Sequence, residues 1–113
     1  MALKVFITGA SSGIGEALAV CYAGKGATLG LAARRAGLLE ELNRRLGGGH
    51  AVYPLDVCDA PALRAAADDF IARFGAPDIV IANAGVSAGT LTERAEDLAA
   101  FRRIMDTNVF GMA

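Results

Sequence analysis

The chain has 113 residues, and its 11 basic and 12 acidic side chains give a formal net charge of −1 at pH 7. This length allows one domain with a modest core, but not two. The balanced charge excludes a basic nucleic-acid or anionic-membrane binder, and the apolar runs are too short to span a membrane. A strand is predicted to begin at residue 3, so no signal peptide is expected and we predict a cytoplasmic protein.

Apolar runs and amphipathic stretches alternate along the chain. Continuous apolar runs predict strands at residues 3–7, 28–33, 51–55 and 78–82. The stretches that follow them predict helices at residues 13–23, 36–46, 60–74 and 95–106. Strands buried on both faces are typical of parallel sheets, and their crossovers are right-handed. The order therefore predicts an α/β fold of three layers, with a doubly wound parallel sheet in the strand order 3-2-1-4.

Several single residues are interpreted as structural. The second and third helices each carry an apolar face, formed by Leu38, Leu39, Leu42 and Leu46 and by Leu63, Ala67, Phe70 and Phe74. Asp59 is expected to cap the start of the third helix, and Gly75 to end it. Cys21 falls on the apolar face of the first helix and Cys58 follows a strand; their spacing fits no metal or redox site, so both are expected to be free thiols. His50 is interpreted as a loop residue.

The most informative stretch is TGASSGIG at residues 8–15, between the first predicted strand and the first predicted helix. Its glycines are spaced Gly-x-x-x-Gly-x-Gly. Glycine lets the backbone turn tightly and approach a phosphate closely, and the N-terminus of the next helix attracts the same anion. The turn is therefore predicted to bind a dinucleotide. The residues assigned to this role are Gly9, Ser11, Ser12, Gly13, Ile14 and Gly15.

This glycine spacing, with Thr8 before it, resembles the short-chain dehydrogenase/reductase family, whose motif reads T-G-x-x-x-G-[IL]-G. The extended branch of that family has its second glycine one position earlier, where this chain has Ser12. The chain therefore resembles the main, short branch. The resemblance implies a Rossmann-type domain, of which residues 1–113 would form the N-terminal part of a single NAD(P)-binding domain, incomplete by itself.

The residues after the second predicted strand indicate which dinucleotide is bound. NAD-preferring sites carry an acidic residue there, which binds the ribose 2′-hydroxyl and would repel a 2′-phosphate. Here Ala33 is followed by Arg34 and Arg35, and guanidinium groups bind phosphate through paired, charge-assisted hydrogen bonds. NADP(H) is therefore predicted in preference to NAD(H). The alternative is that one or both arginines are simply solvated at the start of a helix.

Two further clusters match the family at strand ends and are predicted to bind the cofactor. They are Asp56 and Val57 after the third strand, and Asn83, Ala84 and Gly85 after the fourth. The resemblance implies that Asp56 accepts a hydrogen bond from the adenine amino group; otherwise it is a turn or cap residue. It also implies that the Asn-Ala-Gly run, where Ala82 replaces a first asparagine, passes close to the adenosine ribose and is braced by Thr8.

One catalytic residue is implied by the resemblance. Asn108 resembles the asparagine of the family's Asn-Ser-Tyr-Lys tetrad, whose role is to hold a water in a proton relay; otherwise it caps a helix. Neither Tyr22 nor Tyr53 has a lysine four residues later, so neither is assigned as the catalytic tyrosine. Ser87 is interpreted as a loop hydroxyl. Residues 1–113 alone are therefore expected to be inactive.

These features predict an NADP(H)-dependent oxidoreductase that interconverts a small-molecule alcohol and a carbonyl, with this chain supplying the dinucleotide-binding half. The resemblance implies a dimer or tetramer for the complete protein; no metal, nucleic acid or membrane is expected. Two alternatives stay open: a non-catalytic NADP(H)-binding or regulatory module completed by a partner, and a member acting on nucleotide sugars, which the glycine spacing disfavours. Against the module, the fourth strand is expected to be a bare apolar edge.

Overall fold

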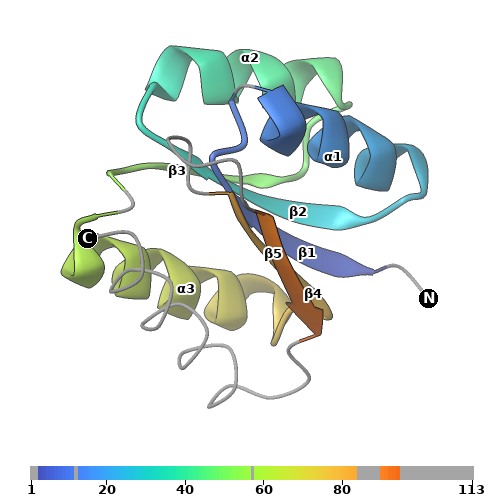
Figure 1. Cartoon of the computed structure of the whole chain (residues 1–113). Coiled ribbons are helices and arrows are strands. Elements are labelled where there is room, and N and C mark those ends of the chain that lie inside the picture. Colours follow the sequence, from blue (N-terminus) through green and yellow to red (C-terminus); the bar gives the residue numbers. More distant parts are fainter. Residues whose placement is uncertain (1–2, 12, 57, 84–89, 95–113) are drawn as a thin grey trace.

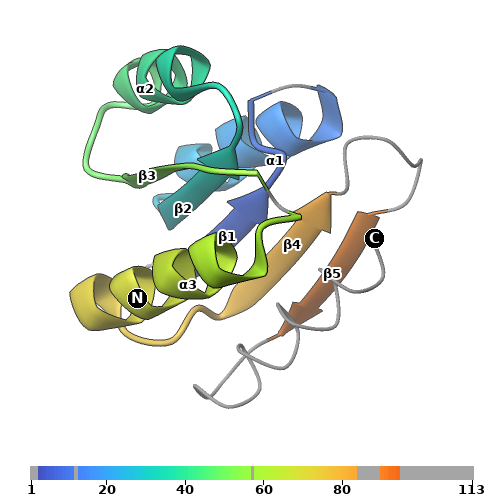
Figure 2. The same cartoon turned by 90° about the vertical axis from the view of Figure 1, so that its left-hand side faces the viewer.

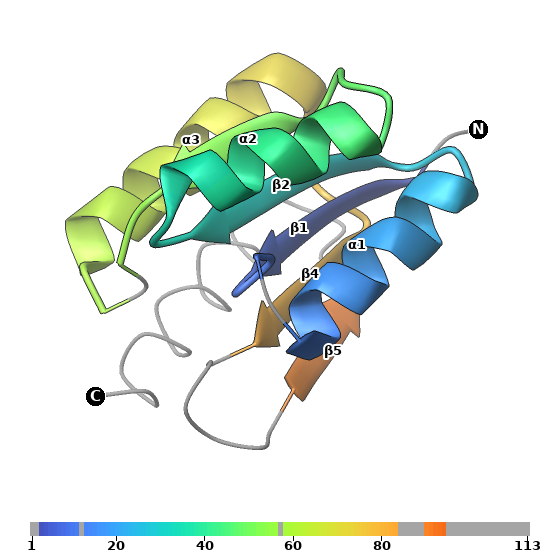
Figure 3. The ribbon, with the colours of Figure 1, turned by 90° about the horizontal axis from the view of Figure 1, so that it is seen from above.

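The computed structural model describes residues 3–11, 13–56, 58–83 and 90–94 (Figure 1). The elements in chain order are β1 (Lys4–Thr8), α1 (Gly13–Gly24), β2 (Thr28–Ala33), α2 (Ala36–Arg45), β3 (Ala51–Pro54), α3 (Ala60–Phe74), β4 (Ile79–Asn83) and β5 (Thr90–Arg94). The strands form one sheet in the order β3-β2-β1-β4-β5. Helices α1 and α2 lie on one face of the sheet and α3 on the other, which makes three layers (Figures 1 and 3).

The parallel part of the sheet confirms the predicted order 3-2-1-4. β1 pairs in parallel with β2 and β4, and β2 pairs in parallel with β3. Val5, Phe6 and Ile7 of β1 are fully buried because helices cover both faces of the strand. Successive side chains of a strand point to opposite faces, so Phe6 joins the core under α3, whereas Val5 and Ile7 join the core under α1 and α2.

β4 is not the bare edge expected from the sequence, because β5 pairs with it. The two strands are antiparallel, from Ile79 opposite Arg94 to Asn83 opposite Thr90 (Figure 2). β5 has the sequence TLTER. Its single apolar residue and charged end lack the continuous apolar run that reveals a parallel strand, so hydropathy alone does not predict it.

The opposite edge of the sheet, β3, is blunted by a proline. The Leu55 N–H donates to the Ala33 carbonyl at 2.8 Å, which turns the Leu55 amide toward β2. Because amides along a parallel strand alternate between its two sides, Pro54 faces away from β2, where it has no N–H to offer. This edge therefore presents few donors to a further strand.

α3 packs on the sheet through its predicted apolar face. Leu63, Ala67 and Phe70 are buried, and Phe70 meets Phe6 edge-on with ring centroids 5.5 Å apart. The two rings meet over Gly30 in β2, where an added Cβ would lie 2.7 Å from both of them. Glycine is thus required in this strand for space, because both aromatic rings occupy the volume of a side chain.

The ends of α3 confirm the predicted caps. The Asp59 carboxylate accepts a hydrogen bond from the Ala62 N–H at 3.2 Å, with Pro61 in the first turn. Gly75 ends the helix with φ +89°, a conformation that side chains disfavour, and its N–H donates to the Ile71 carbonyl. Both caps satisfy backbone groups that a helix leaves without intrahelical partners.

α2 departs from its predicted pattern at two residues. Leu39 and Leu42 are buried as expected, but Leu38 is 42% exposed. The helix ends at Arg45, and Leu46 follows it as the C-cap residue, half-buried against the core. The apolar face of α2 is therefore narrower than four leucines suggest.

α1 is apolar almost all round, so its sequence does not identify its buried face. The buried residues of this helix are the small Gly15 and Ala19, while Leu18, Tyr22 and Ala23 are partly buried against the same core. The expectation that Cys21 lies on the apolar face was wrong in consequence, since its side chain is exposed. Ile14 and Val20 are 56% and 46% exposed. No helix in the described ranges is both long and apolar enough to cross a membrane.

Candidate functional site

The glycine-rich turn lies at the carboxyl end of β1 and leads into α1. Gly9 and Gly13 have φ values of +68° and +58°, so these two positions require the conformational freedom of glycine. Gly15 lies within α1, is not among the glycines with positive φ, and is buried. The Ala10 N–H donates to the Ala32 carbonyl at 3.2 Å, which ties the turn to the end of β2. The turn, the N-terminus of α1 and the end of β2 therefore lie side by side.

The two arginines predicted to bind a 2′-phosphate follow β2 directly. Ala33 is buried, whereas Arg34 and Arg35 are exposed. Arg35 occupies the N-cap position of α2 and makes no side-chain capping bond. Among the described residues, no carboxylate lies within ion-pair distance of either guanidinium. Both side chains are thus available to an anion beside the turn.

Asp56 follows β3, and the structure shows it in a turn. Its Oδ1 accepts the Cys58 N–H at 2.9 Å, and its carbonyl accepts the Asp59 N–H at 2.9 Å. Asp56 is exposed, and a carboxylate accepts several hydrogen bonds at once. The turn contact therefore holds the carboxylate at the carboxyl end of the sheet without using its full capacity as an acceptor.

The fourth cluster begins at Asn83, the last residue of β4. β4 runs beside β1 with Ala82 opposite Thr8, and Thr8 is buried. The parallel register therefore brings Asn83 to the same end of the sheet as the glycine-rich turn. Ser11 lies within that turn and is half-buried. Several predicted residues and one predicted helix fall outside the described residues: Ser12, Val57, Ala84, Gly85, Ser87, Asn108 and the helix at 95–106.

The two tyrosines of the chain lie in structural contacts. The Tyr53 hydroxyl donates to Asp69 Oδ2 at 2.7 Å. Burial, together with the hydrogen bond and negative charge of Asp69, raises the pKa of Tyr53 well above its ordinary value. A tyrosine that transfers a proton near neutral pH needs the opposite shift. Tyr22 lies in α1 with Lys25 Nζ 5.8 Å from its ring centroid.

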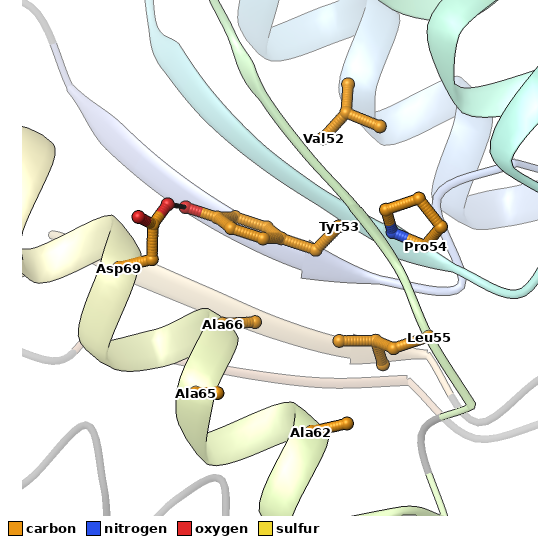
Figure 4. Close-up of a pocket in the computed structure, with 8 residues that line it drawn as sticks. All are labelled: Val52, Tyr53, Pro54, Leu55, Ala62, Ala65, Ala66 and Asp69. Atoms are coloured by element: carbon orange, nitrogen blue, oxygen red, sulfur yellow. Dashed lines mark hydrogen bonds between the residues drawn. The ribbon is translucent and has the colours of Figure 1, made fainter.

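A hollow of about 360 Å³ opens on the surface between β3 and α3 (Figure 4). Its walls are mostly apolar, and Tyr53 reaches across it to Asp69 (Figure 4). The lining residues are Val52, Tyr53, Pro54, Leu55, Ala62, Ala65, Ala66 and Asp69. None of the predicted cofactor residues is among them, so this hollow is separate from the cluster at the strand ends.

His50 has a more specific role than the loop residue expected from the sequence. Its Nδ1 accepts the backbone N–H of Leu29 at 3.1 Å, and its own N–H donates to Asn43 Oδ1 at 3.3 Å. The only signal in the sequence is the glycine run before it, which predicts a turn but not the destination of the imidazole. Within the described ranges, no three His, Cys, Asp or Glu side chains form a group that would hold a metal.

A doubly wound parallel sheet with a glycine-rich turn before its first helix defines the class of Rossmann-type nucleotide-binding folds. The comparison with protein families agrees with this class and narrows it. The family model described as short chain dehydrogenase matches residues 3–113. The chain belongs to that family.

The chain spans about a third of the length of each of three proteins that it matches. The 11-beta-hydroxysteroid dehydrogenase A of Sesamum indicum is 44% identical over 111 residues, which cover 95% of this chain and 32% of the relative. An alcohol dehydrogenase from the archaeon Thermococcus sibiricus, solved with 5-hydroxy-NADP, is 34% identical with a TM-score of 0.62 over 71% of this chain and 36% of its own. A 3-ketoacyl-(acyl-carrier-protein) reductase from Brucella melitensis, solved with NADH, is 28% identical with a TM-score of 0.65 over 69% and 32%.

Proposed function

We propose that the protein binds NADP(H) at the carboxyl end of its sheet and forms the cofactor-binding part of an oxidoreductase that interconverts an alcohol and a carbonyl. The bound nicotinamide cofactor would supply or accept the hydride. In this proposal the backbone of Gly9, Gly13 and Gly15 and the N-terminus of α1 hold the pyrophosphate. Family membership supports the reaction class, and the observation that carries the choice of cofactor is the pair of exposed arginines after β2.

Charge at the end of β2 supports the preference for NADP(H). An acidic residue at Ala33 would repel a 2′-phosphate, but this position holds a buried methyl group. Arg34 and Arg35 are exposed beside the turn, and the described residues offer them no competing carboxylate. A hydrogen bond to a charged group contributes roughly 1.5–3 kcal/mol, so a preference of about 10- to 100-fold is expected.

The other predicted residues complete the proposed site. Asp56 would accept from the adenine amino group, and the run from Asn83 to Gly85 would border the adenosine ribose. Asn108 would hold a water for proton transfer, serving a tyrosine and a lysine that residues 1–113 do not contain at the required spacing. We therefore expect these 113 residues alone to bind NADPH with a Kd of about 0.1–1 mM or weaker, and to show no turnover.

The test compares NADPH and NADH affinities by fluorescence titration in the wild-type chain and in Arg34→Ala, Arg35→Ala and the double variant. We expect the double variant to bind NADPH at least about tenfold more weakly, with NADH affinity unchanged. Arg44→Ala is the matched control, because Arg44 is exposed in the last turn of the same helix. Equal losses for both cofactors, or none for NADPH, would overturn the proposed 2′-phosphate contact.

A second function, a binding or regulatory module without chemistry, gains support from β5. One argument against such a module was an uncovered β4, and β5 pairs with that strand along its whole length. A chain whose intact mass is 11.6 kDa and which binds NADPH tightly as a soluble monomer would favour the module. Reduction of a panel of carbonyl compounds by the longer protein would favour the oxidoreductase. The proposed small-molecule substrate and oligomeric assembly belong to the oxidoreductase alternative, in the longer protein.

A further inference from the structure

His50 joins three elements at the amino end of the sheet. The turn before it contains Gly47, Gly48 and Gly49, with φ values of +96°, +76° and +83°. This sharp turn places the imidazole beside β2, where Nδ1 accepts a hydrogen bond from the Leu29 N–H at 3.1 Å. The backbone N–H of His50 donates to the Asn43 side chain of α2 at 3.3 Å.

The imidazole replaces a strand partner that β3 does not supply. β3 begins at Ala51, opposite Gly30, so the ladder between β2 and β3 starts one residue after Leu29. Leu29 is completely buried, and a buried N–H without an acceptor is costly. The Nδ1 lone pair is therefore the acceptor that completes the edge of the sheet at this point.

We propose that His50 forms a pH-sensitive contact, the hydrogen bond from the Leu29 N–H, between β2 and the turn that connects α2 to β3. Only an imidazole with an unprotonated Nδ1 accepts a hydrogen bond from Leu29. Protonation converts this acceptor into a donor that points at another donor, and the contact must open. The proposal is independent of cofactor binding, because His50 lies at the opposite end of the strands from the glycine-rich turn.

The local environment favours the neutral ring. Burial lowers the pKa of His50, and a backbone hydrogen bond with Leu46 acts in the opposite direction. β2 and β3 carry no charged side chain. α2, which supplies Asn43 to the contact, carries Glu40, Glu41, Arg44 and Arg45, and Arg45 is paired with Glu16 of α1 at 2.9 Å. Burial is the larger of the two effects on the pKa of His50, so the neutral ring is favoured.

The sign of the pH dependence follows from linkage. The unfolded chain, with the ordinary histidine pKa of about 6.5, binds the proton more readily than the folded chain does. The stability from this contact is therefore complete above pH 6.5 and is lost as the pH falls through the lower pKa of the folded state. The loss begins at the edge formed by β3 and the turn, because that is where the contact opens.

The test is NMR hydrogen exchange of the Leu29 amide, corrected for the intrinsic rate, combined with ring ¹⁵N shifts of His50. We expect the protection of Leu29 to fall by up to about tenfold per pH unit between pH 6.5 and the lower pKa of the folded state, as Nδ1 becomes protonated. Amides in the middle of β1 should change less. His50→Asn is the matched variant, because Asn Oδ1 occupies the place of Nδ1 and does not titrate.

The outcomes distinguish a contact that opens when His50 is protonated from a structural contact that does not respond to pH. In His50→Asn we expect Leu29 to stay protected at low pH, and in His50→Ala to be less protected at every pH. Equal pH dependence of Leu29 protection in the wild type and in His50→Asn would overturn the proposal. If His50→Ala does not fold, the wild-type ring shifts and the Asn variant still test the proposed pH-sensitive contact. Titration of Nδ1 without any change in Leu29 protection would equally refute it.

Discussion

The two ends of the sheet differ in whether their polar side chains are hydrogen-bonded or exposed. At the amino end, the Lys4 N–H donates to Asp78 Oδ2 at 2.9 Å, the Lys4 Nζ donates to the Phe74 carbonyl at 3.1 Å, and His50 accepts from Leu29. These contacts join residues 21 to 74 positions apart in the chain. At the carboxyl end, Arg34 and Arg35 are exposed and have no carboxylate partner among the described residues. Long-range side-chain hydrogen bonds thus join elements at the amino end, whereas the carboxyl end exposes two arginines without a carboxylate partner in the described part of the chain.

This difference assigns separate roles to the two ends. The long-range contacts of the amino end stabilise the fold, since each of them joins two elements distant in sequence. The exposed charges of the carboxyl end contribute little to folding, because water solvates them in both states. Substitutions at the amino end should therefore alter stability alone, and those at the carboxyl end should alter binding.

The largest loss of stability is expected from a substitution in the middle of β2, between the two ends of the sheet. Gly30→Ala places a Cβ 2.7 Å from the rings of Phe6 and Phe70, and neither ring can withdraw from the packed core. We expect the free energy of unfolding to fall by about 3 kcal/mol, at the upper end of overpacking costs. Urea unfolding measures it.

Gly37→Ala is the control for this substitution. Gly37 lies in α2 with no atom within 4 Å of an added Cβ, so alanine there should leave stability unchanged or raise it by about 0.5 kcal/mol. If the two variants unfold at the same urea concentration, the close packing of Gly30 under the aromatic rings is incorrect.

How much of this fold the sequence predicts depends on the kind of interaction. The parallel strands follow from buried apolar runs such as residues 3–7, which occur because helices cover both faces. The cap at Asp59 follows from local chemistry that a short stretch contains in full. β5 cannot be predicted in this way, because it forms by pairing with β4. Nor can the buried face of α1, because contacts with residues far away in the chain determine that Ala19 is buried and Cys21 is exposed.

A smaller effect is expected from opening the amino end at Asp78. In Asp78→Ala the Lys4 N–H loses its acceptor, which should lower the free energy of unfolding by about 1–2 kcal/mol. The ratio of NADPH to NADH affinity should stay the same, because the arginines lie at the other end. Asp78→Asn retains an acceptor oxygen and should recover most of the loss; a changed cofactor ratio in either variant would contradict the separation of the two ends.

The candidate site illustrates a similar limit to prediction. The glycine spacing places the turn correctly because positive φ values at Gly9 and Gly13 are a local requirement that the sequence itself expresses. The function of His50 does not show in the sequence, since its acceptor role depends on β3 starting one residue too late to meet Leu29. Local backbone geometry can thus be predicted from the sequence, whereas a side-chain hydrogen bond that replaces a missing strand partner cannot.

The smallest expected change in stability gives the sharpest comparison of the two ends. Gly13 and Gly48 have φ values of +58° and +76°, and an added Cβ meets no atom within 4 Å at either position. Gly13→Ala and Gly48→Ala should therefore each lower the free energy of unfolding by about 1 kcal/mol, the cost of a left-handed alanine.

The same pair should differ in binding. Gly13 opens α1 at the proposed pyrophosphate position, so Gly13→Ala should weaken NADPH binding by about tenfold beyond its effect on stability, whereas Gly48→Ala should not. Fluorescence titration well below the unfolding temperature measures both. Because the two variants carry the same backbone strain, any difference in affinity reports the position of the glycine in the sheet. A matching loss in both variants would mean that binding responds to general destabilisation, and the assignment of the dinucleotide to the carboxyl end would fail.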